Sequence, residues 1–315
     1  MQGTVTKSTG SWYQVRTQSG ELVQCRIVGK LRLRGIKSTN PVAVGDVVDF
    51  KMEEGEETGV ISEIHDRKNY IIRKSVNLAK QTQIIAANLD QAVLIVTLDF
   101  PRTYPRFIDR FLVTAEAYSI PAVLVFNKVD LYNDAHLDEL EFYTYAYEDA
   151  GYAVLHTSVP GELGLEALKK QLADKTSLLS GHSGVGKSTL INTIEPTLDL
   201  KTKAISDSHH QGQHTTTFAE MFELSFGGYI IDTPGIRGFG LVDMEKEEIG
   251  DYFPEIFRIK DQCKFNNCLH TEEPGCAVKE AVEAGELAYT RYDSYVNFVN
   301  GTDDDETYRK DIYAK

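Results

Sequence analysis

Three short motifs hold the residues whose types and spacing suggest chemistry on a nucleoside triphosphate. The first reads GHSGVGKS and fits the pattern G-x-x-x-x-G-K-[ST]. In such a loop the backbone N–H groups cradle phosphates, the lysine reaches the terminal phosphates and the hydroxyl binds Mg²⁺. The predicted phosphate-binding residues are Gly181, His182, Ser183, Gly184, Val185, Gly186, Lys187, Ser188 and Thr189.

The second motif is suited to reading a guanine base. Asn127-Lys128-Val129-Asp130 fits N-K-x-D, and a carboxylate at Asp130 can accept hydrogen bonds from two N–H groups on the edge of guanine. Adenine does not offer that pair, so the motif favours GTP over ATP. Thr157 and Ser158 follow an apolar run where a second base-contacting loop is expected, although two hydroxyl residues after a strand are a weak signal.

The third motif is Asp232-Thr233-Pro234-Gly235. We expect Asp232 to be a second Mg²⁺ ligand beside Ser188, and Gly235 to lie near the phosphates. In most GTPases the phosphate loop comes first and the base reader last. Here the base reader comes about fifty residues before the phosphate loop. This order predicts a circularly permuted nucleotide domain.

The residue that orients the attacking water is not at its usual place. Many small GTPases have a glutamine directly after D-x-x-G, whereas this chain has Ile236, which can neither donate nor accept a hydrogen bond. A polar stretch over 205–217 precedes it, and such loops are usually functional or disordered. We expect His214 to orient the water, Thr216 to sense Mg²⁺ and the γ-phosphate, and Lys187 to complete the catalytic set, with slow turnover that a partner stimulates. A metal site at the histidines of this stretch is the weaker alternative.

A fourth group of residues has the spacing of a metal site. Cys263, Cys268, His270 and Cys276 fall within fourteen residues and match the Cys₃His set of structural zinc, which leaves no coordination position open for catalysis. The alternative is three free cysteines and a surface histidine. Cys25 stands apart and is expected in a core.

The nucleotide motifs need an α/β domain to position them. Apolar runs typical of buried parallel strands precede the motifs, and segments with helical spacing alternate with them. A hairpin with a glycine turn at 227–228 is expected before Asp232. The expected strands are 92–96, 122–126, 153–158, 177–179 and 229–231, and the expected helices are 107–117, 137–148 with its end at Gly151, 163–172 and one beginning at 188.

The first segment is typical of a small all-β barrel. Its alternating runs are separated by turn residues, and an oligonucleotide-binding (OB) barrel is the usual choice, with an SH3-like barrel as the alternative. Trp12, Tyr13 and Tyr70 are candidates for stacking on bases, although aromatic residues in small barrels more often lie in the core. The expected strands are 12–16, 22–27, 47–50 and 59–64.

Composition sets limits on partners and location. The net charge is −14 over 315 residues, yet residues 1–80 carry 13 Lys or Arg against 9 Asp or Glu. Within them, Lys30, Arg32, Arg34 and Lys37 form either a solvated strand pair or a phosphate-contacting face. The apolar runs are too short to span a membrane and the N-terminus has no signal-peptide core. A cytosolic chain is expected.

The expected division is an OB-like barrel over 1–78, a circularly permuted GTPase domain over 79–240 and a small α-rich zinc-binding domain over 241–315. In the last domain the pattern predicts helices over 241–252 and 277–285. The fold class is therefore multi-domain α/β, with one structural zinc and Mg²⁺ bound with GTP.

Taken together, these motifs resemble those of one family, the RsgA (YjeQ) ribosome-associated, circularly permuted GTPases. The likeness covers essentially the whole chain, and its motifs are Asn40-Pro41, Val44-Gly45-Asp46, Asn127 to Asp130, Gly181 to Thr189, Gly212 to Thr217, Asp232 to Arg237 and Cys263 to Cys276. The resemblance implies a late-stage maturation factor of the small ribosomal subunit, and we expect it to be cytoplasmic with no membrane partner. It also implies binding of that subunit's rRNA by a monomer, GTP hydrolysis stimulated by the subunit, and release on or after hydrolysis.

Two other classes of function are consistent with parts of the pattern. One is a permuted GTPase with a regulatory or metabolic role unrelated to ribosomes, which leaves the barrel unexplained. The other is a binding module that has lost the use of its nucleotide site. The presence of Lys187, Ser188 and Asp232 argues against this class, because an unused site has no reason to keep all three. Hydrophobic Ile236 and a catalytic histidine at His214 are traits that the family resemblance also implies.

Overall fold

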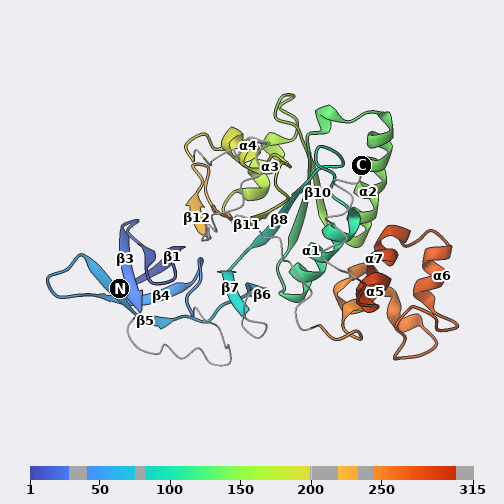
Figure 1. Cartoon of the computed structure of the whole chain (residues 1–315), viewed down its shortest axis with the longest axis horizontal. Helices are drawn as coiled ribbons and strands as arrows, with labels where there is room; N and C mark the ends of the chain where they lie inside the picture. The colour runs from blue at the N-terminus through green and yellow to red at the C-terminus, as the bar shows by residue number, and fades with distance from the viewer. Residues whose placement is uncertain (28–40, 75–81, 199, 201–218, 233–243, 303–315) are drawn as a thin grey trace, which may run out of the picture.

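A computed structural model describes residues 1–27, 41–74, 82–198, 200, 219–232 and 244–302. Several predicted residues lie outside these ranges, so the structure does not place them. They are the basic Lys30, Arg32, Arg34 and Lys37, the polar stretch with His214 and Thr216, and Gly235 and Ile236 after Asp232. Figure 1 shows the described parts as a barrel at one end, a sheet with helices in the middle, and a small helical domain at the other end.

The N-terminal segment forms a closed barrel of five strands. The strands follow the order β1-β2-β3-β5-β4, and β4 pairs back with β1. Alternating buried residues fill the interior, including Cys25 and Tyr13, while Trp12 is 41% exposed. Tyr13 is therefore a core residue, whereas the ring of Trp12 is accessible. The bounds are β1 Gln2–Ser8, β2 Tyr13–Thr17, β3 Leu22–Ile27, β4 Val47–Met52 and β5 Thr58–Ile64.

A two-stranded hairpin that the sequence did not predict follows the barrel. It consists of β6, Tyr70–Lys74, and β7, Thr82–Ala87, which pair in antiparallel fashion. Ala87 N–H donates to the carbonyl of Val44, so the hairpin also touches the barrel. The expected boundary at residue 78 falls between these two strands.

The middle of the chain forms the expected parallel sheet. Its order is β10-β9-β8-β11-β13-β12, in which every neighbouring pair is parallel except the β12–β13 hairpin. Both faces of β8 and β9 are buried, as the continuous apolar runs predict. The bounds are β8 Gln91–Val96, β9 Ala122–Asn127, β10 Ala153–Thr157, β11 Thr176–Ser180, β12 Glu220–Glu223 and β13 Tyr229–Asp232.

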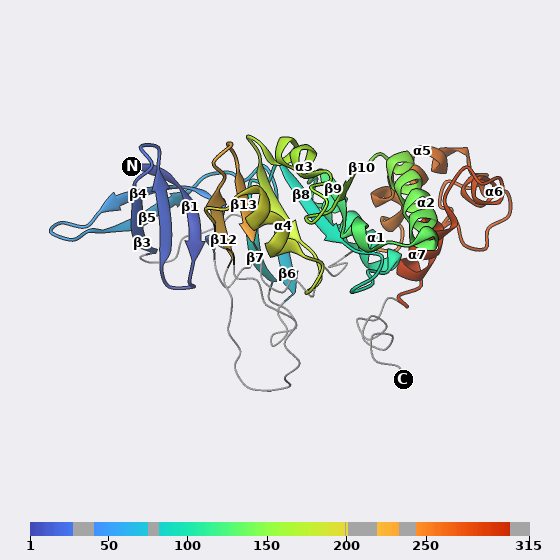
Figure 2. The ribbon, with the colours of Figure 1, turned by 90° about the horizontal axis from the view of Figure 1, so that it is seen from above.

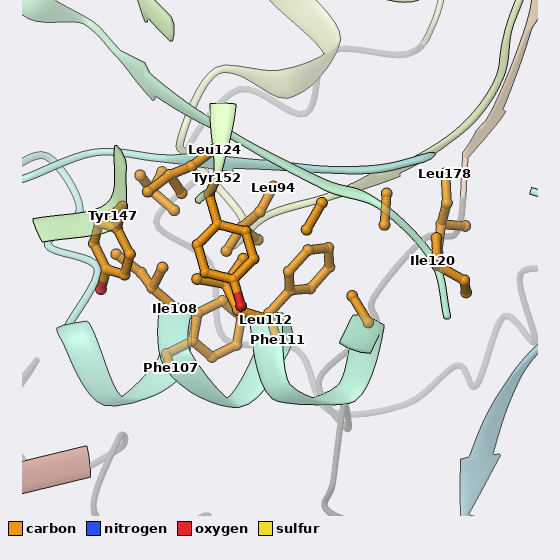
Figure 3. Close-up of a cluster of buried hydrophobic side chains, with 14 of the residues drawn as sticks. Leu94, Phe107, Ile108, Phe111, Leu112, Ile120, Leu124, Tyr147, Tyr152 and Leu178 are labelled. Atoms are coloured by element: carbon orange, nitrogen blue, oxygen red, sulfur yellow. The ribbon is translucent and has the colours of Figure 1, made fainter. Parts of the chain in front are cut away.

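Helices cover both faces of this sheet. Side chains of α1 (Pro105–Ala117) and α2 (Asp134–Ala150) pack with Leu94 and Leu124 in one core, which Figure 3 shows around α1. The helices α3 (Leu165–Leu172) and α4 (Lys187–Ile194) pack with alternate strand residues in a second core. The predicted end of α2 is confirmed, because Gly151 caps it at φ 105°, a left-handed conformation that favours glycine.

The C-terminal domain is small and helical. It contains 3₁₀ turns at Ile249–Tyr252 and Lys260–Gln262 and the helices α5 (Pro254–Ile259), α6 (Ala277–Glu283) and α7 (Tyr289–Val299). The predicted helix over 241–252 was wrong in its described part, where only the last four residues are helical. Pro254 starts a new helix directly afterwards, which restricts Phe253 to an extended backbone. The predicted helix over 277–285 is confirmed as α6.

Contacts at both ends of the nucleotide domain join these parts. Strand β1 of the barrel pairs with β12, so that barrel and nucleotide sheet form one continuous sheet, as Figure 2 shows. At the other end, Arg291 of α7 is buried against Asp109 of α1 and Glu255 of α5. The helices within the described ranges include none long and apolar enough to cross a membrane.

Candidate functional site

The nucleotide motifs meet at one edge of the parallel sheet. Strand β9 ends at Asn127, β10 at Thr157, β11 at Ser180 and β13 at Asp232. Because the carboxyl ends of parallel strands lie at the same edge, the loops after them converge there, where α/β folds bind their ligands. The unusual chain order of the motifs therefore does not prevent them from meeting at one site.

Asn127 ties the base-reading loop to the phosphate loop. Its side chain is 3% exposed, and Nδ2 donates to the carbonyl of Val185 at 2.9 Å. Its Oδ1 accepts from the hydroxyl of Thr157, also at 2.9 Å. A Cβ at Gly186 would lie 2.6 Å from Nδ2, so only glycine leaves room for this contact. Thr157 thus orients Asn127 and is itself fully buried.

Lys128 spans the gap between the same two loops. Its Nζ donates to the carbonyls of Gly184 and Phe100, each at 2.6 Å. Partial burial lowers the pKa of this lysine, an effect that the nearby Asp130 carboxylate opposes. The backbone of Lys128 is left-handed, with φ 63°. Because the two carbonyl groups hold the ammonium group, the aliphatic part of the side chain extends across the site and can cover one face of a base.

Asp130 is held in place by the loop after β10. One carboxylate oxygen, Oδ1, accepts from the hydroxyl of Ser158 at 2.6 Å. Ser158 Oγ in turn accepts a weaker bond from the backbone N–H of Gly161 at 3.3 Å. The two hydroxyl residues that the sequence suggested for the second base-contacting loop therefore have different partners: Thr157 contacts Asn127 and Ser158 contacts Asp130.

The phosphate loop has the strand–loop–helix setting that its motif requires. It connects β11 to α4, and Gly181, Gly184 and Gly186 all have positive φ angles, of 153°, 92° and 90°. The ring of His182 packs against Phe107 of α1 with centroids 3.9 Å apart, while Ser183 and Thr189 are exposed. Backbone N–H groups at a helix N-terminus suit an anionic phosphate.

The ionic group of the site is a lysine–aspartate pair. Lys187 Nζ lies 2.6 Å from Asp232 Oδ1, and both side chains are largely shielded, with 16% and 20% exposed. Ser188 follows Lys187 in the first turn of α4. A hydroxyl and a carboxylate are hard oxygen donors, which fits Mg²⁺ as the ion that they would bind together with phosphates.

Three supporting groups carried no signal in the sequence. The hydroxyl of Tyr132 accepts from the backbone N–H of Leu98 and donates to the carbonyl of Asn127, so it joins the ends of β8 and β9. The backbone of Phe100 holds Lys128, and Pro101 packs beside Gly184. Contacts through carbonyl groups and through ring packing do not depend on a recognisable residue pattern, which is why the motifs did not reveal them.

The predicted metal ligands also come together. The ligand atoms of Cys263, Cys268, His270 and Cys276 all lie within 4.8 Å of one another. Cys263 Sγ is 3.9 Å from Cys276 Sγ, and His270 Nδ1 is 3.5 Å from Cys263 Sγ and 3.4 Å from Cys276 Sγ. Tetrahedral zinc would separate two sulfurs by about 3.8 Å and a sulfur from a nitrogen by about 3.6 Å. The residues fit the ion.

The loop around these ligands is braced by its own hydrogen bonds. Tyr292 and Tyr295 of α7 donate to the carbonyls of His270 and Leu269, both at 2.7 Å. The carboxylate of Glu273 accepts from the backbone N–H groups of Leu269 and Thr271. Burial raises the pKa of Cys268 to about 12. A bound divalent cation would favour the thiolate over the neutral thiol.

Known proteins match this chain over almost its whole length. Residues 2–61 match the model of the RsgA N-terminal domain, and residues 64–242 match that of the RsgA GTPase. A protein of Flavobacterium psychrophilum named small ribosomal subunit biogenesis GTPase RsgA is 61% identical over 99% of this chain and 96% of its own length. A protein of the same name from Christiangramia forsetii is 60% identical over the full length of both.

Solved structures agree with these relatives. The crystal structure of YjeQ from Thermotoga maritima is 36% identical, with a TM-score of 0.78 over 95% of this chain and 97% of that one. YloQ, described as a circularly permuted GTPase, is 34% identical, with a TM-score of 0.71 over 100% and 96%. The barrel, the permuted nucleotide domain and the Cys₃His domain are thus confirmed as one architecture. The chain belongs to the RsgA family of GTPases.

Proposed function

We propose that this chain binds GTP at the edge of the parallel sheet and hydrolyses it to GDP and phosphate. The observation that supports this most directly is the contact between Asn127 Nδ2 and the carbonyl of Val185. It holds the base reader at a fixed offset from the phosphate loop, so one nucleotide can occupy both. A site of this kind has its specificity and its chemistry in two rigidly connected loops.

Guanine recognition falls to Asp130 and Lys128 in this proposal. The carboxylate of Asp130, steadied by Ser158 at 2.6 Å, accepts from the two N–H groups on the base edge. The stem of Lys128 covers one face of the base while Gly184 and Phe100 hold its charge. An adenine would leave the Asp130 carboxylate without the two N–H donors that guanine offers, which is a costly mismatch.

The phosphates lie over the glycine-rich loop. Backbone N–H groups from 181 to 189 cradle them, and Lys187 exchanges its bond to Asp232 for the terminal phosphates. Ser188 and Asp232 would hold Mg²⁺, which neutralises the charge that develops on the phosphate oxygens. Release of Asp232 from Lys187 makes its carboxylate available on the side that faces the nucleotide.

Water activation is assigned to residues outside the described ranges. We propose that His214 orients the attacking water and that Thr216 senses the γ-phosphate, because Ile236 occupies the position where a glutamine would act. A water oriented by one imidazole on a long polar segment predicts slow intrinsic turnover. Stimulation by a partner that positions His214 for this role follows from the same reasoning.

The partner that we propose is the small ribosomal subunit and its rRNA. The two relatives compared above, which match almost the full chain, are named for the biogenesis of that subunit. The barrel, over 1–78, holds the excess of positive charge within an otherwise acidic chain, which suits contact with RNA phosphates. The chain would act as a cytoplasmic monomer in late subunit maturation and be released on or after hydrolysis.

The remaining domain would be stabilised by zinc. The four ligands at 263–276 form a closed set, so the ion would support the fold of residues 241–315 and take no part in hydrolysis. The nucleotide domain, over 79–240, would then lie between an RNA-binding barrel and a metal-stapled domain.

Nucleotide choice tests the proposal. Asp130→Asn should weaken GTP binding and shift preference toward xanthosine triphosphate, because an amide N–H matches the carbonyl that xanthine has in place of the guanine amine. Competition binding of GTP, ATP and xanthosine triphosphate to both proteins measures this. Wild-type protein that binds ATP as tightly as GTP would contradict the assignment of the base reader.

A further inference from the structure

Two carboxylates face each other across the strand pair that leads to the phosphate site. Glu220 of β12 and Asp232 of β13 are direct partners in the antiparallel register. Residues that are directly opposite point to the same face of the sheet, with Cβ atoms about 5 Å apart, and like charges in such a pair repel. The negative charge on Glu220 therefore acts on whatever cation Asp232 attracts.

Each carboxylate has its own lysine, and the two lysines come from different domains. Lys187 of the phosphate loop lies 2.6 Å from Asp232 Oδ1. Lys7 of the barrel lies 2.9 Å from Glu220 Oε2 and 3.0 Å from Oε1. The four charged side chains thus follow one another from the barrel to the phosphate loop as a cation, two anions and a cation.

The barrel strand is held in position to make this contact. Lys7 and Glu220 are also backbone partners where β1 joins β12, and Figure 2 shows β12 between β1 and β13. A second ion pair crosses the same junction, with Arg16 Nη1 2.6 Å from Glu223 Oε2. The charge on Lys7 is therefore placed by the sheet and does not depend on a chance side-chain encounter.

We propose that Lys7, acting through Glu220, sets the affinity of Asp232 for Mg²⁺ in the nucleotide-bound protein. The proposal rests on the assignment of Asp232 as a Mg²⁺ ligand. Once Lys187 turns to the phosphates, Glu220 is the nearest residue in the register to add negative potential at Asp232, and Lys7 cancels it. Lys7 and Glu220 are positioning residues in this scheme, since neither touches the nucleotide.

This arrangement gives the barrel a route to the metal site. An RNA phosphate that draws Lys7 away from Glu220 would leave the carboxylate uncompensated and tighten Mg²⁺ binding at Asp232. By thermodynamic linkage, Mg²⁺ at Asp232 would in turn favour that RNA contact. The effect is electrostatic and requires no movement of one domain against another.

The test is the Mg²⁺ dissociation constant of the full-length chain saturated with GDP, measured by isothermal titration calorimetry. Lys7→Glu should tighten Mg²⁺ binding about threefold, and Glu220→Lys should weaken it about threefold, as expected when one half-exposed side chain a few ångströms away reverses its charge. The double variant Lys7→Glu/Glu220→Lys restores a neutral pair and should return to within about twofold of wild type. Lys7→Gln, which removes one charge instead of reversing it, should give about half the logarithmic shift of Lys7→Glu.

The matched control is Lys51→Glu, the same charge reversal on an exposed lysine of β4. In the barrel register Lys51 lies beyond Gln2, at the opposite end of β1 from Lys7, so its reversal should leave Mg²⁺ binding unchanged. Equal shifts in the Lys7 and Lys51 variants, or a double variant that does not recover, would overturn the inference. Wild-type protein whose GDP complex takes up no Mg²⁺ would instead refute the proposed nucleotide site, and this inference with it.

Discussion

The buried ion cluster between α1, α5 and α7 should be the most costly single contact to break in the C-terminal half. Arg291 is 1% exposed and lies against Asp109 and Glu255, which are 0% and 5% exposed. Burial opposes the charge on Arg291, but the two carboxylates raise its pKa well above the usual value. The guanidinium also lies 4.7 Å from the ring centre of Phe253.

Arg291→Met keeps most of the side-chain volume and removes the charge, so two carboxylates remain buried without their cation. Breaking a buried pair in this way costs about 3–5 kcal/mol. A matched control crosses the same α1–α7 contact: Arg106 pairs with Asp293 at 3.1 Å, but these side chains are 28% and 43% exposed. Arg106→Met should therefore cost at most about 1 kcal/mol.

Hydrogen exchange of peptides from α1 and α7 measures these costs locally, which suits a chain of several domains. Protection in both helices should fall sharply in Arg291→Met and little in Arg106→Met. Replacing all three members by apolar residues, as in Asp109→Leu/Glu255→Met/Arg291→Met, should be milder than Arg291→Met alone. Equal loss of protection in the Arg291 and Arg106 variants would refute the reasoning.

Three further predictions concern the metal, catalysis and pH. Cys268→Ala should lose the single bound metal and unfold the C-terminal domain while GTP binding persists, as metal analysis and calorimetry would show; an unaltered melting profile in metal-free protein would contradict this. His214→Ala should slow GTP turnover with little change in GTP affinity, whereas unchanged stimulated turnover would exclude that histidine. Burial lowers the pKa of His156, opposed by Glu148, and Thr144 Oγ1 lies 2.8 Å from its Nε2. The unfolded chain therefore takes up this proton first as pH falls below about 6.5. The free energy of unfolding therefore decreases as the pH falls from about 6.5 toward the lower pKa of the folded state. In His156→Gln the denaturation midpoint should depend less steeply on pH between pH 7 and pH 5. An unchanged pH dependence of the midpoint would show that His156 does not contribute to it.

The sequence was sufficient to predict the groups whose chemistry depends on local spacing. The glycines, Lys187 and Ser188 work as a short loop, and the Cys₃His set works as one knuckle, so both can be recognised without knowledge of the fold. Alternation and turn residues predict a small barrel, and the OB type is preferred over an SH3-like one because it is the commoner choice. Its closure through the β1–β4 pairing is confirmed by the strand order.

The features that the sequence did not reveal are contacts between distant segments. The pairing of β1 with β12 joins residues more than two hundred positions apart, and nothing in either strand marks its partner. The support of Lys128 by the carbonyl of Phe100 involves no side chain of Phe100, so residue type carries no information about it. The predicted helix over 241–252 failed because apolar spacing in a short segment does not distinguish a helix from turns ahead of a proline.

The most direct test of the proposed role is GTP turnover by the full-length chain, measured alone, with purified small ribosomal subunits and with large subunits. We expect slow turnover alone, strong stimulation by small subunits and none by large ones. Ser188→Ala, which removes a proposed Mg²⁺ ligand, should abolish the stimulated rate. Turnover that is indifferent to small subunits would contradict the proposed function and leave a permuted GTPase with another partner.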